Sequence, residues 1–445
     1  MKFFRPFILI SCSFLLSTAS LQNLFASDTS DLASSPSLAN PKKKNKKHKE
    51  TGPVNQLSEM NGRKLIYYHF PYPESLKPAV EFWKKIYAEY DKDDSVIHDT
   101  RYFVIYSVVN VNQKEETDAN DDLSLTPSTR KSQIAQEKKR ILEILLKLSQ
   151  GEYDPKELTG EEARIYHLFD TIEDPYKFVN ASDENRIRSQ RGQKDKFLEA
   201  IPASGKYLTE IEDILISKGV PWEISRLPFV ESMFNLQARS SVGASGIWQF
   251  MPYTGRLYMT VNGQVDERND PIDATHAAAE LLKSNYEQLG NWALAINAYN
   301  SGLQTLSNAK AAMGTDDIGV IIQSYEGGVY KFASRNFYPC FLAVLEISNH
   351  YKNYFGELSR APKMAYESMT VEAPIRLSEL ASSAGVELET LRAMNPAYHS
   401  SFFYSSKEFP AGKSLKIPPA SKEKFVEALK EIQERKEALS SIAKY

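Results

Sequence analysis

The stretch LPFVESMFN places a single carboxylic acid, Glu231, among apolar residues. Four apolar side chains flank it in sequence: Leu227, Phe229, Val230 and Met233. Burial beside such side chains disfavours the charged carboxylate and raises the pKa of the acid. A carboxylic acid with a pKa near neutrality can protonate the leaving oxygen of a glycosidic bond. We therefore take Glu231 as the candidate catalytic acid.

Most glycosidases need two carboxyl groups, one as the acid and one as the base or nucleophile. The motif-bearing part of this chain offers one. A single acid/base is sufficient if the attacking hydroxyl belongs to the substrate itself. Glu231 would then donate its proton to the glycosidic oxygen and accept the proton of that hydroxyl afterwards.

Two further stretches follow FVESMFN along the chain, GASGIWQFMP and INAYNSG. The three contain Glu231-Ser232, then Gly246-Ile247-Trp248-Gln249, then Ala298-Tyr299-Asn300. In order and spacing, this set resembles the signatures of the lytic murein transglycosylases, and within that family the membrane-bound D group. The resemblance covers roughly residues 65–420.

The resemblance implies a mainly α fold class. It predicts a lysozyme-like α-helical catalytic domain, a helical N-terminal region before it, and a small α+β LysM-like module after it. It also implies a lyase that cleaves the β-1,4 bond between N-acetylmuramic acid and N-acetylglucosamine and leaves 1,6-anhydro ends. The implied partner is the peptidoglycan glycan strand. No metal, organic cofactor or nucleic acid is indicated.

By the same resemblance, the residues beside Glu231 in the site take part in substrate binding. Those expected to contact or orient the sugar, or to line the cleft, are Ser232, Gln249, Tyr299, Asn300, Trp248 and Met251.

Two alternatives stay open. Many family members carry Glu-Thr-Arg-Asn-Tyr where this chain has ASRNF, beginning at Ala333. The missing glutamate motivates a glycan-binding scaffold with an inactive enzyme domain. The other alternative is a muramidase, a hydrolase on the same fold, which needs a second carboxylate to hold water. The candidates for that carboxylate are Asp266, Glu267 and Asp270.

Helical patterns surround these motifs. Pro221 can open a helix, and Pro228 would bend the one that carries Glu231. Apolar spacing and the glycines Gly290 and Gly302 predict two further helices that end there. Residues 201–356 therefore read as the helical catalytic domain, and residues 61–200 as a helical N-terminal region. Within the latter, RYFVIYSVVNV fits a strand or a helix.

The C-terminal part changes character. Residues 367–419 read as strand, helix, helix and strand, the order expected of the LysM-like peptidoglycan-binding module. Residues 420–445 read as a charged helical tail.

The first 27 residues have the form of a signal peptide: a basic start with Lys2 and Arg5, then an apolar stretch. The alternative is a lipoprotein, because the residues before Cys12 resemble a lipobox and would anchor the chain in a membrane. Residues 28–60 read as a disordered basic tether. Both readings predict export to the periplasm or cell envelope. Cys340 then has no disulfide partner and is expected to be buried.

The 445-residue chain carries a net charge of −3. That near balance implies no partner recognised by bulk charge.

Overall fold

The computed structural model describes residues 69–110 and 127–442. The predicted signal peptide, the tether and Cys12 lie outside the described residues, as does the end of the predicted tail. Within the described ranges, no helix combines the length and the apolar character needed to cross a bilayer.

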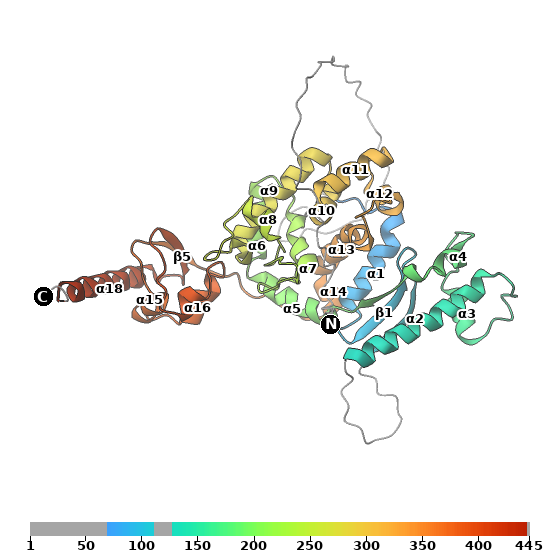
Figure 1. The fold of residues 1–445 in the computed structure, drawn as a ribbon, viewed down its shortest axis with the longest axis horizontal. Helices are drawn as coiled ribbons and strands as arrows, with labels where there is room; N and C mark the ends of the chain where they lie inside the picture. The colour runs from blue at the N-terminus through green and yellow to red at the C-terminus, as the bar shows by residue number, and fades with distance from the viewer. Residues whose placement is uncertain (1–68, 111–126, 443–445) are drawn as a thin grey trace, which may run out of the picture.

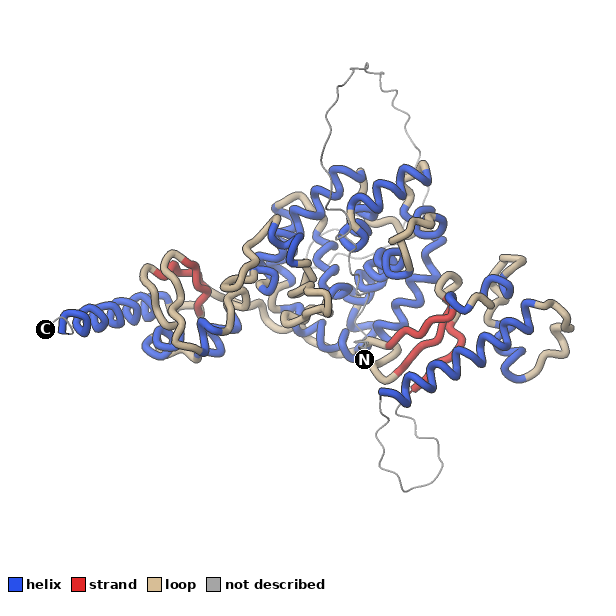
Figure 2. The backbone as a smooth tube through the Cα atoms, in the orientation of Figure 1, coloured by secondary structure: helices blue, strands red, loops and turns tan. Residues whose placement is uncertain are grey.

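Three hydrophobic cores divide the described chain. A large helical body lies in the middle, a small sheet with its covering helices lies at one end, and a compact C-terminal module lies at the other (Figure 1). Helices dominate throughout, and the few strands lie at the two ends (Figure 2). The predicted mainly α fold class is confirmed.

The N-terminal elements include a three-stranded antiparallel sheet with the order β2-β1-β3. They are η2 (Glu74–Leu76), α1 (Lys77–Ala88), β1 (Asp94–Asp99), β2 (Ile105–Asn110), α2 (Pro127–Ser149), α3 (Gly160–His167), α4 (Lys177–Ala181), η3 (Glu184–Arg186) and β3 (Ile187–Arg191). The central strand β1 is buried over nearly its whole length, with α2 packed against the sheet.

This sheet corrects the prediction of a helical N-terminal region, in which RYFVIYSVVNV alone was left open between strand and helix. RYFVIYSVVNV contributes the strand β2, and the segment Ile187–Arg191, which we expected to be helical, is the strand β3. Its sequence, IRSQR, carries one apolar residue and several polar ones, so its periodicity says little. The segment is a strand because it pairs with β1 over its whole length, from Ser95↔Arg191 to Asp99↔Ile187. Such pairing between distant segments is not visible in local sequence.

The central body holds the three motifs. Its elements are α5 (Lys194–Gly205), α6 (Leu208–Ser217), η4 (Trp222–Arg226), α7 (Leu227–Glu231), α8 (Pro252–Arg256), η5 (Glu267–Asn269), α9 (Pro271–Leu289), α10 (Trp292–Ser301), α11 (Leu303–Met313), α12 (Ile318–Ser324), α13 (Phe332–Asn349) and α14 (Tyr351–Phe355).

Helix α1 belongs to the core of this body, although it comes early in the chain. It packs along α13. The indole Nε1 of Trp83 donates a buried hydrogen bond to Asn336 Oδ1 at 2.7 Å. The proposed boundary between an N-terminal region and a catalytic domain at residue 200 therefore runs through elements that share one core.

The C-terminal elements keep the predicted order of strand, helix, helix and strand, with one further short helix, α17, inserted before the second strand. They are β4 (Glu367–Val371), α15 (Leu377–Ser383), α16 (Leu388–Met394), α17 (Ser401–Tyr404), β5 (Lys413–Ile417) and α18 (Lys422–Ile442). Strands β4 and β5 pair antiparallel. The first half of α18 buries Phe425, Leu429 and Ile432 in the same core. The described part of the predicted tail is thus helical and partly packed against the module.

The module touches the central body at the loop of residues 262–270. The amide of Asp266 donates to Ala397 O at 2.8 Å, and the amide of His399 donates to Gln264 O at 3.0 Å. The ammonium of Lys416 lies 2.6 Å from Asp270 Oδ2. Two backbone bonds and one ion pair therefore connect the module to a loop that also contacts the motif GASGIWQFMP, as described below.

Candidate active site

Glu231 is the last residue of α7, a short helix in the middle of the central body (Figure 1). The bend expected at Pro228 takes the form of a break: the 3₁₀ helix η4 ends at Arg226, and Pro228 lies in the first turn of α7. The four residues of α7 before Glu231 are buried. The short helix therefore holds Glu231 at the edge of the core.

Burial raises the pKa of Glu231 from 4.5 to about 8. The residue keeps some exposed surface, while protein surrounds its carboxyl group. Desolvation is the cause, because the charged form loses more solvation than the neutral one. At neutral pH the protonated form therefore dominates, and the partly exposed Glu231 carries a proton. The predicted apolar neighbours are all buried: Leu227, Phe229, Val230 and Met233.

Two tyrosine phenol groups lie close enough to Glu231 for its negative charge to raise their pKa values. Burial raises the pKa of Tyr299, on α10, well above its ordinary value, and the negative charge of Glu231 adds to the effect. Burial likewise raises the pKa of Tyr87, on α1, where the Cys340 thiol contributes and Glu231 adds a smaller share. The site is therefore enclosed by α1, α7, α10 and α13. Cys340 is buried, as predicted.

The backbone around Glu231 contains unusual conformations. Met233 and Phe234 have φ of 52° and 53°, and Gln249 has φ of 49°. Residues other than glycine seldom adopt this left-handed region, and they do so at a cost of about 1–3 kcal/mol each where the surrounding structure imposes it. The three residues lie directly after Glu231 and within the second motif. Strain of this kind gathers at sites that need one fixed geometry.

Ser232 joins the first motif to the second. Its hydroxyl lies 3.0 Å from Ile247 O and 3.2 Å from Pro228 O, so it donates to backbone carbonyl groups. The structure gives Ser232 a role in holding the two segments together. A contact between Ser232 and substrate stays a prediction.

The second motif is a tight turn fixed by its own side chains. The side-chain Nε2 of Gln249 donates to Gly246 O at 2.7 Å and to Ala238 O at 3.2 Å. Gly246 has φ of 74°, and a Cβ there would lie 1.8 Å from Arg268 O. Only glycine therefore allows the loop that contains Arg268 to approach this closely.

The sequence analysis did not identify Arg268 as a site residue, yet its side chain stabilises this turn through hydrogen bonds. Its Nη1 donates to Phe250 O at 2.9 Å and to Gly243 O at 2.8 Å. Asp266 holds the guanidinium through two bonds of 2.8 Å. Arg268 lies among three acidic residues in DERND, which resembles an ordinary charged loop. Its role depends on contacts with residues distant in sequence.

The third motif contacts the second through Tyr299, whose hydroxyl donates to Trp248 O at 2.8 Å. Trp248 has no exposed surface, and its indole Nε1 donates to Thr275 Oγ1 at 2.9 Å. The side chain of Trp248 is therefore fully buried and has no surface to contact a sugar, contrary to the expected lining of the cleft. Asn300 is buried, and Met251 is half-buried at the start of α8.

The three carboxylates considered for a hydrolase are all engaged within the protein. Asp266 pairs with Arg268, and Glu267 Oε2 accepts the amide of Thr260 at 2.6 Å. Asp270 accepts from the amide of Ile272 at the start of α9 and pairs with Lys416. Each of these three carboxylates therefore has a structural role.

The family comparisons match two parts of the chain. Residues 215–322, which contain all three motifs, match the model of the transglycosylase SLT domain. The chain carries a transglycosylase SLT domain. Residues 365–434 match the model described as the LysM-like domain of lytic transglycosylase MltD. The predicted resemblance to lytic transglycosylases of the D group is thereby confirmed.

Two curated proteins are similar to part of this chain. The membrane-bound lytic murein transglycosylase D of Escherichia coli K12 is 26% identical over 224 residues, which cover 49% of this chain and 47% of the relative. A putative tributyltin chloride resistance protein of Alteromonas sp. M-1 is 34% identical over 109 residues, 23% of this chain and 51% of the relative. The chain thus spans about half the length of the curated relatives it matches.

Two solved structures are also similar. The 70 kDa soluble lytic transglycosylase of Escherichia coli is 17% identical, with a TM-score of 0.30, covering 52% of this chain and 37% of that one. The lytic transglycosylase Slt of Pseudomonas aeruginosa, an inactive mutant, is 17% identical with a TM-score of 0.29, covering 53% and 38%.

The raised pKa of Glu231 makes the stability of the SLT domain depend on pH. The folded protein keeps a proton that the unfolded chain releases, so the carboxyl destabilises the fold as pH rises from about 4.5 to about 8. Glu231→Gln removes this effect. We expect the variant to match the parent near pH 4 and to exceed its free energy of unfolding by about 5 kcal/mol near pH 9. Urea unfolding at both pH values measures the difference.

The matched control for this comparison is Glu287→Gln, on the exposed face of α9. Its free energy of unfolding should equal that of the parent at both pH values. If Glu231→Gln has the same free energy of unfolding as the parent at high pH, the pKa of Glu231 is not raised in the folded protein, and the argument from burial is wrong.

The glycines of the second motif give a second test. Gly243 and Gly246 both have positive φ, so alanine is strained at either position. At Gly243, a Cβ would make only an ordinary contact with Pro252, at 3.6 Å, whereas at Gly246 it overlaps Arg268 O. We expect Gly246→Ala to lower the free energy of unfolding by about 1–3 kcal/mol more than Gly243→Ala does. Equal losses in urea unfolding would show that the loops can separate freely.

Proposed function

We propose that the protein is a lytic transglycosylase that cleaves the β-1,4 bond between N-acetylmuramic acid and N-acetylglucosamine in peptidoglycan. The observation that carries the proposal is the single carboxyl group of Glu231, with a pKa of about 8, inside an SLT domain. At neutral pH this group holds the proton that a leaving glycosidic oxygen requires.

The proposed reaction uses Glu231 twice. The carboxyl first donates its proton to the glycosidic oxygen as the bond to C1 breaks. The resulting carboxylate then takes the proton of the muramic acid C6 hydroxyl, whose oxygen closes on C1. The product is a 1,6-anhydro ring, no water is consumed, and Glu231 regains its proton. The engagement of Asp266, Glu267 and Asp270 within the protein supports this sequence over hydrolysis, which needs a second carboxylate.

The other site residues support the acid in this proposal. Tyr299 lies near Glu231, and its hydroxyl donates a hydrogen bond to Trp248 O. This bond orients the second motif against α10. Gln249, Met251 and Asn300 are proposed to contact or orient the sugar. Ser232 contributes by joining the end of α7 to Ile247.

The proposed partner is the glycan strand of peptidoglycan, bound by the SLT domain and the LysM-like domain together. We also propose a location in the cell envelope, which the name of the Escherichia coli relative, a membrane-bound enzyme, supports. Export by the N-terminal segment and attachment through a lipid on Cys12 belong to the same proposal.

Digestion of purified peptidoglycan sacculi, followed by mass spectrometry, tests the function. We expect anhydro-ended muropeptides from the parent protein and a loss of about 10²–10⁴-fold in their rate of formation for Glu231→Gln, the range for losing a general acid. Glu287→Gln, an exposed glutamate on α9, should digest like the parent.

Two results would contradict the proposal in different ways. Reducing ends that carry an added water would identify a hydrolase and direct attention to the three carboxylates named above. If the parent binds sacculi and releases no more product than Glu231→Gln, the protein is a binding scaffold.

A further inference from the structure

Lys416 belongs to the C-terminal module, yet its ammonium reaches a residue of the central body. Its Nζ lies 2.6 Å from Asp270 Oδ2. Protein shields this pair from water, because the side chain of Asp270 is 4% exposed and that of Lys416 is 19% exposed. The pair lies outside the three motifs, and the proposed reaction assigns it no role.

The module holds Lys416 in a fixed position. On strand β5, the amide of Lys416 donates to Asn395 Oδ1 at 2.9 Å, and Asn395 Nδ2 donates to Lys416 O at 2.7 Å. The ammonium also lies 5.1 Å from the centre of the Tyr366 ring. The Tyr366 hydroxyl donates to Glu210 Oε1, on α6, at 2.8 Å. Contacts from the module and from the segment before it therefore restrain Lys416.

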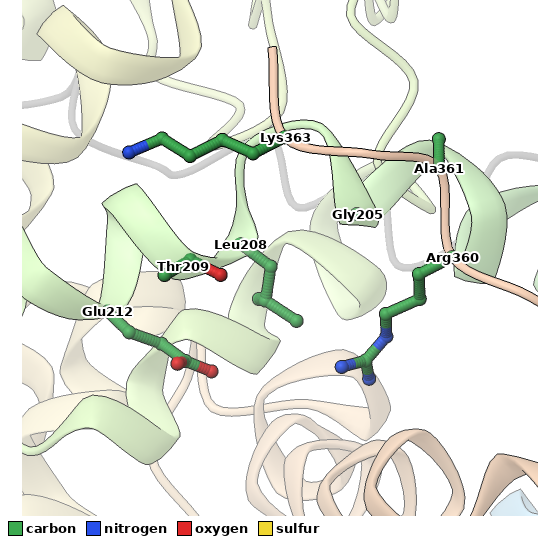
Figure 3. A pocket seen from close by; sticks show the side chains of 7 residues that line it. All are labelled: Gly205, Leu208, Thr209, Glu212, Arg360, Ala361 and Lys363. Atoms are coloured by element: carbon green, nitrogen blue, oxygen red, sulfur yellow. The ribbon is translucent and has the colours of Figure 1, made fainter. Parts of the chain in front are cut away.

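The segment that leads to the module is itself bound to the central body. Figure 3 shows the part that carries Ala361 running past the start of α6. The amide of Ala361 donates to Pro202 O, and the amide of Met364 donates to Lys206 O, each at 3.0 Å. Together with the two backbone bonds between the module and the loop of residues 262–270, these contacts restrict movement of the module. The ion pair therefore forms in a defined geometry.

Asp270 connects Lys416 with the first turn of α9. Its Oδ1 accepts the amide of Ile272 at 2.9 Å and that of Asp273 at 3.3 Å, while its Oδ2 accepts from Lys416. Both carboxylate oxygens are therefore engaged. Burial and then the negative charge of Asp270 raise the pKa of Asp273 to about 6, whereas Lys416 acts to lower it. Lys416 thus offsets the charge of two neighbouring carboxyl groups.

Two routes lead from Asp270 to the second motif. Along α9, the hydroxyl of Thr275 bonds back to the first turn of the helix and accepts the indole Nε1 of Trp248 at 2.9 Å. Along the loop, Arg268 lies two residues before Asp270 and donates to Phe250 O at 2.9 Å. The position of Asp270 therefore affects both the side chain and the backbone of the second motif.

The second motif in turn contacts the surroundings of the acid. Trp248 O accepts the hydroxyl of Tyr299 at 2.8 Å, and Ile247 O accepts the hydroxyl of Ser232 at 3.0 Å. Removing one member of a buried ion pair leaves the charge of the other uncompensated. Without Lys416, the loop around Asp270 would have to open to water, and the second motif would lose part of its support.

We propose that Lys416 is a positioning residue for the active site. It holds Asp270, and through Asp270 it keeps the second motif on its bonds to Ser232 and Tyr299. The LysM-like domain then contributes to the rate of the reaction as well as to glycan binding. This inference rests on the proposed function for its reaction, but the placement of the second motif can be measured without any reaction.

The test uses three variants of the full chain. Lys416→Met removes the charge and keeps most of the side chain, and Lys416→Arg keeps a cation that can pair with Asp270. Lys413→Met changes an exposed lysine on the same strand and is the matched control. Release of anhydro products from a soluble peptidoglycan fragment gives kcat and KM. Co-sedimentation with sacculi on ice measures binding.

We expect Lys416→Met to lower kcat about 10–100-fold, the scale of a displaced active-site group. Its KM and its binding to sacculi should equal those of the parent, because the module itself is unchanged. Lys416→Arg should recover most of the lost rate, and Lys413→Met should match the parent throughout.

NMR of the ¹⁵N-labelled protein follows the second motif directly. The indole Nε1–H signal of Trp248, assigned through the backbone signals of residues 247–249, should move in Lys416→Met and return in Lys416→Arg. The indole of Trp83, which bonds to Asn336 between α1 and α13, is the internal reference and should stay in place.

Four results would overturn the proposal. They are a parental kcat in Lys416→Met, a change confined to KM or to sacculus binding, a loss that Lys416→Arg does not recover, and a joint shift of the Trp83 and Trp248 signals, which would indicate general loss of packing. If the parent forms no anhydro product, the proposed lyase function fails, and the Trp248 signal alone decides whether Lys416 holds the second motif.

Discussion

The carboxyl group of Glu231 lies where protein replaces most of its water, and its pKa of about 8 follows from that placement. Burying an acid costs free energy, because the group must stay protonated or lose the solvation of its charge. The central body meets this requirement with a large continuous core. Helix α1 supplies Tyr87 and α10 supplies Tyr299, and the charge of Glu231 on α7 acts on both. The long-range packing of α1 on α13 is therefore part of the site, although α1 carries none of the motifs.

The second constraint is the shape of the backbone opposite Glu231. Left-handed residues follow the acid and recur in the second motif, and such conformations persist only when surrounding contacts impose them. Ser232, Gln249 and Arg268 supply those contacts through hydrogen bonds to backbone carbonyl groups. The loop that contains Arg268 also receives the C-terminal module, through the pair between Lys416 and Asp270. The module and the motif turn thus both contact the same loop.

Much of this arrangement could be predicted from local sequence, and the exceptions share a cause. Glu231, Tyr299 and Gly246 were found because their motifs stand in a recognisable order, and the C-terminal strand and helix order followed from local patterns. Tyr87 was missed because it is far from Glu231 in sequence and reads as one more apolar residue of a helix. The strand β3 and the burial of Trp248 likewise depend on partners distant in the chain. Spacing predicts which residues form a motif, whereas it says little about which other residues enclose them.

The most direct test of this account is the pKa of Glu231 itself. A titration of the protein labelled with ¹³C in the glutamate carboxyl groups, followed by NMR, reports each carboxyl separately, and Glu231→Gln assigns the signal of Glu231. The account predicts a midpoint near 8, with the group still protonated at neutral pH. A midpoint near the ordinary value of 4.5 would contradict it, because Glu231 would then be ionised at neutral pH and have no proton to donate.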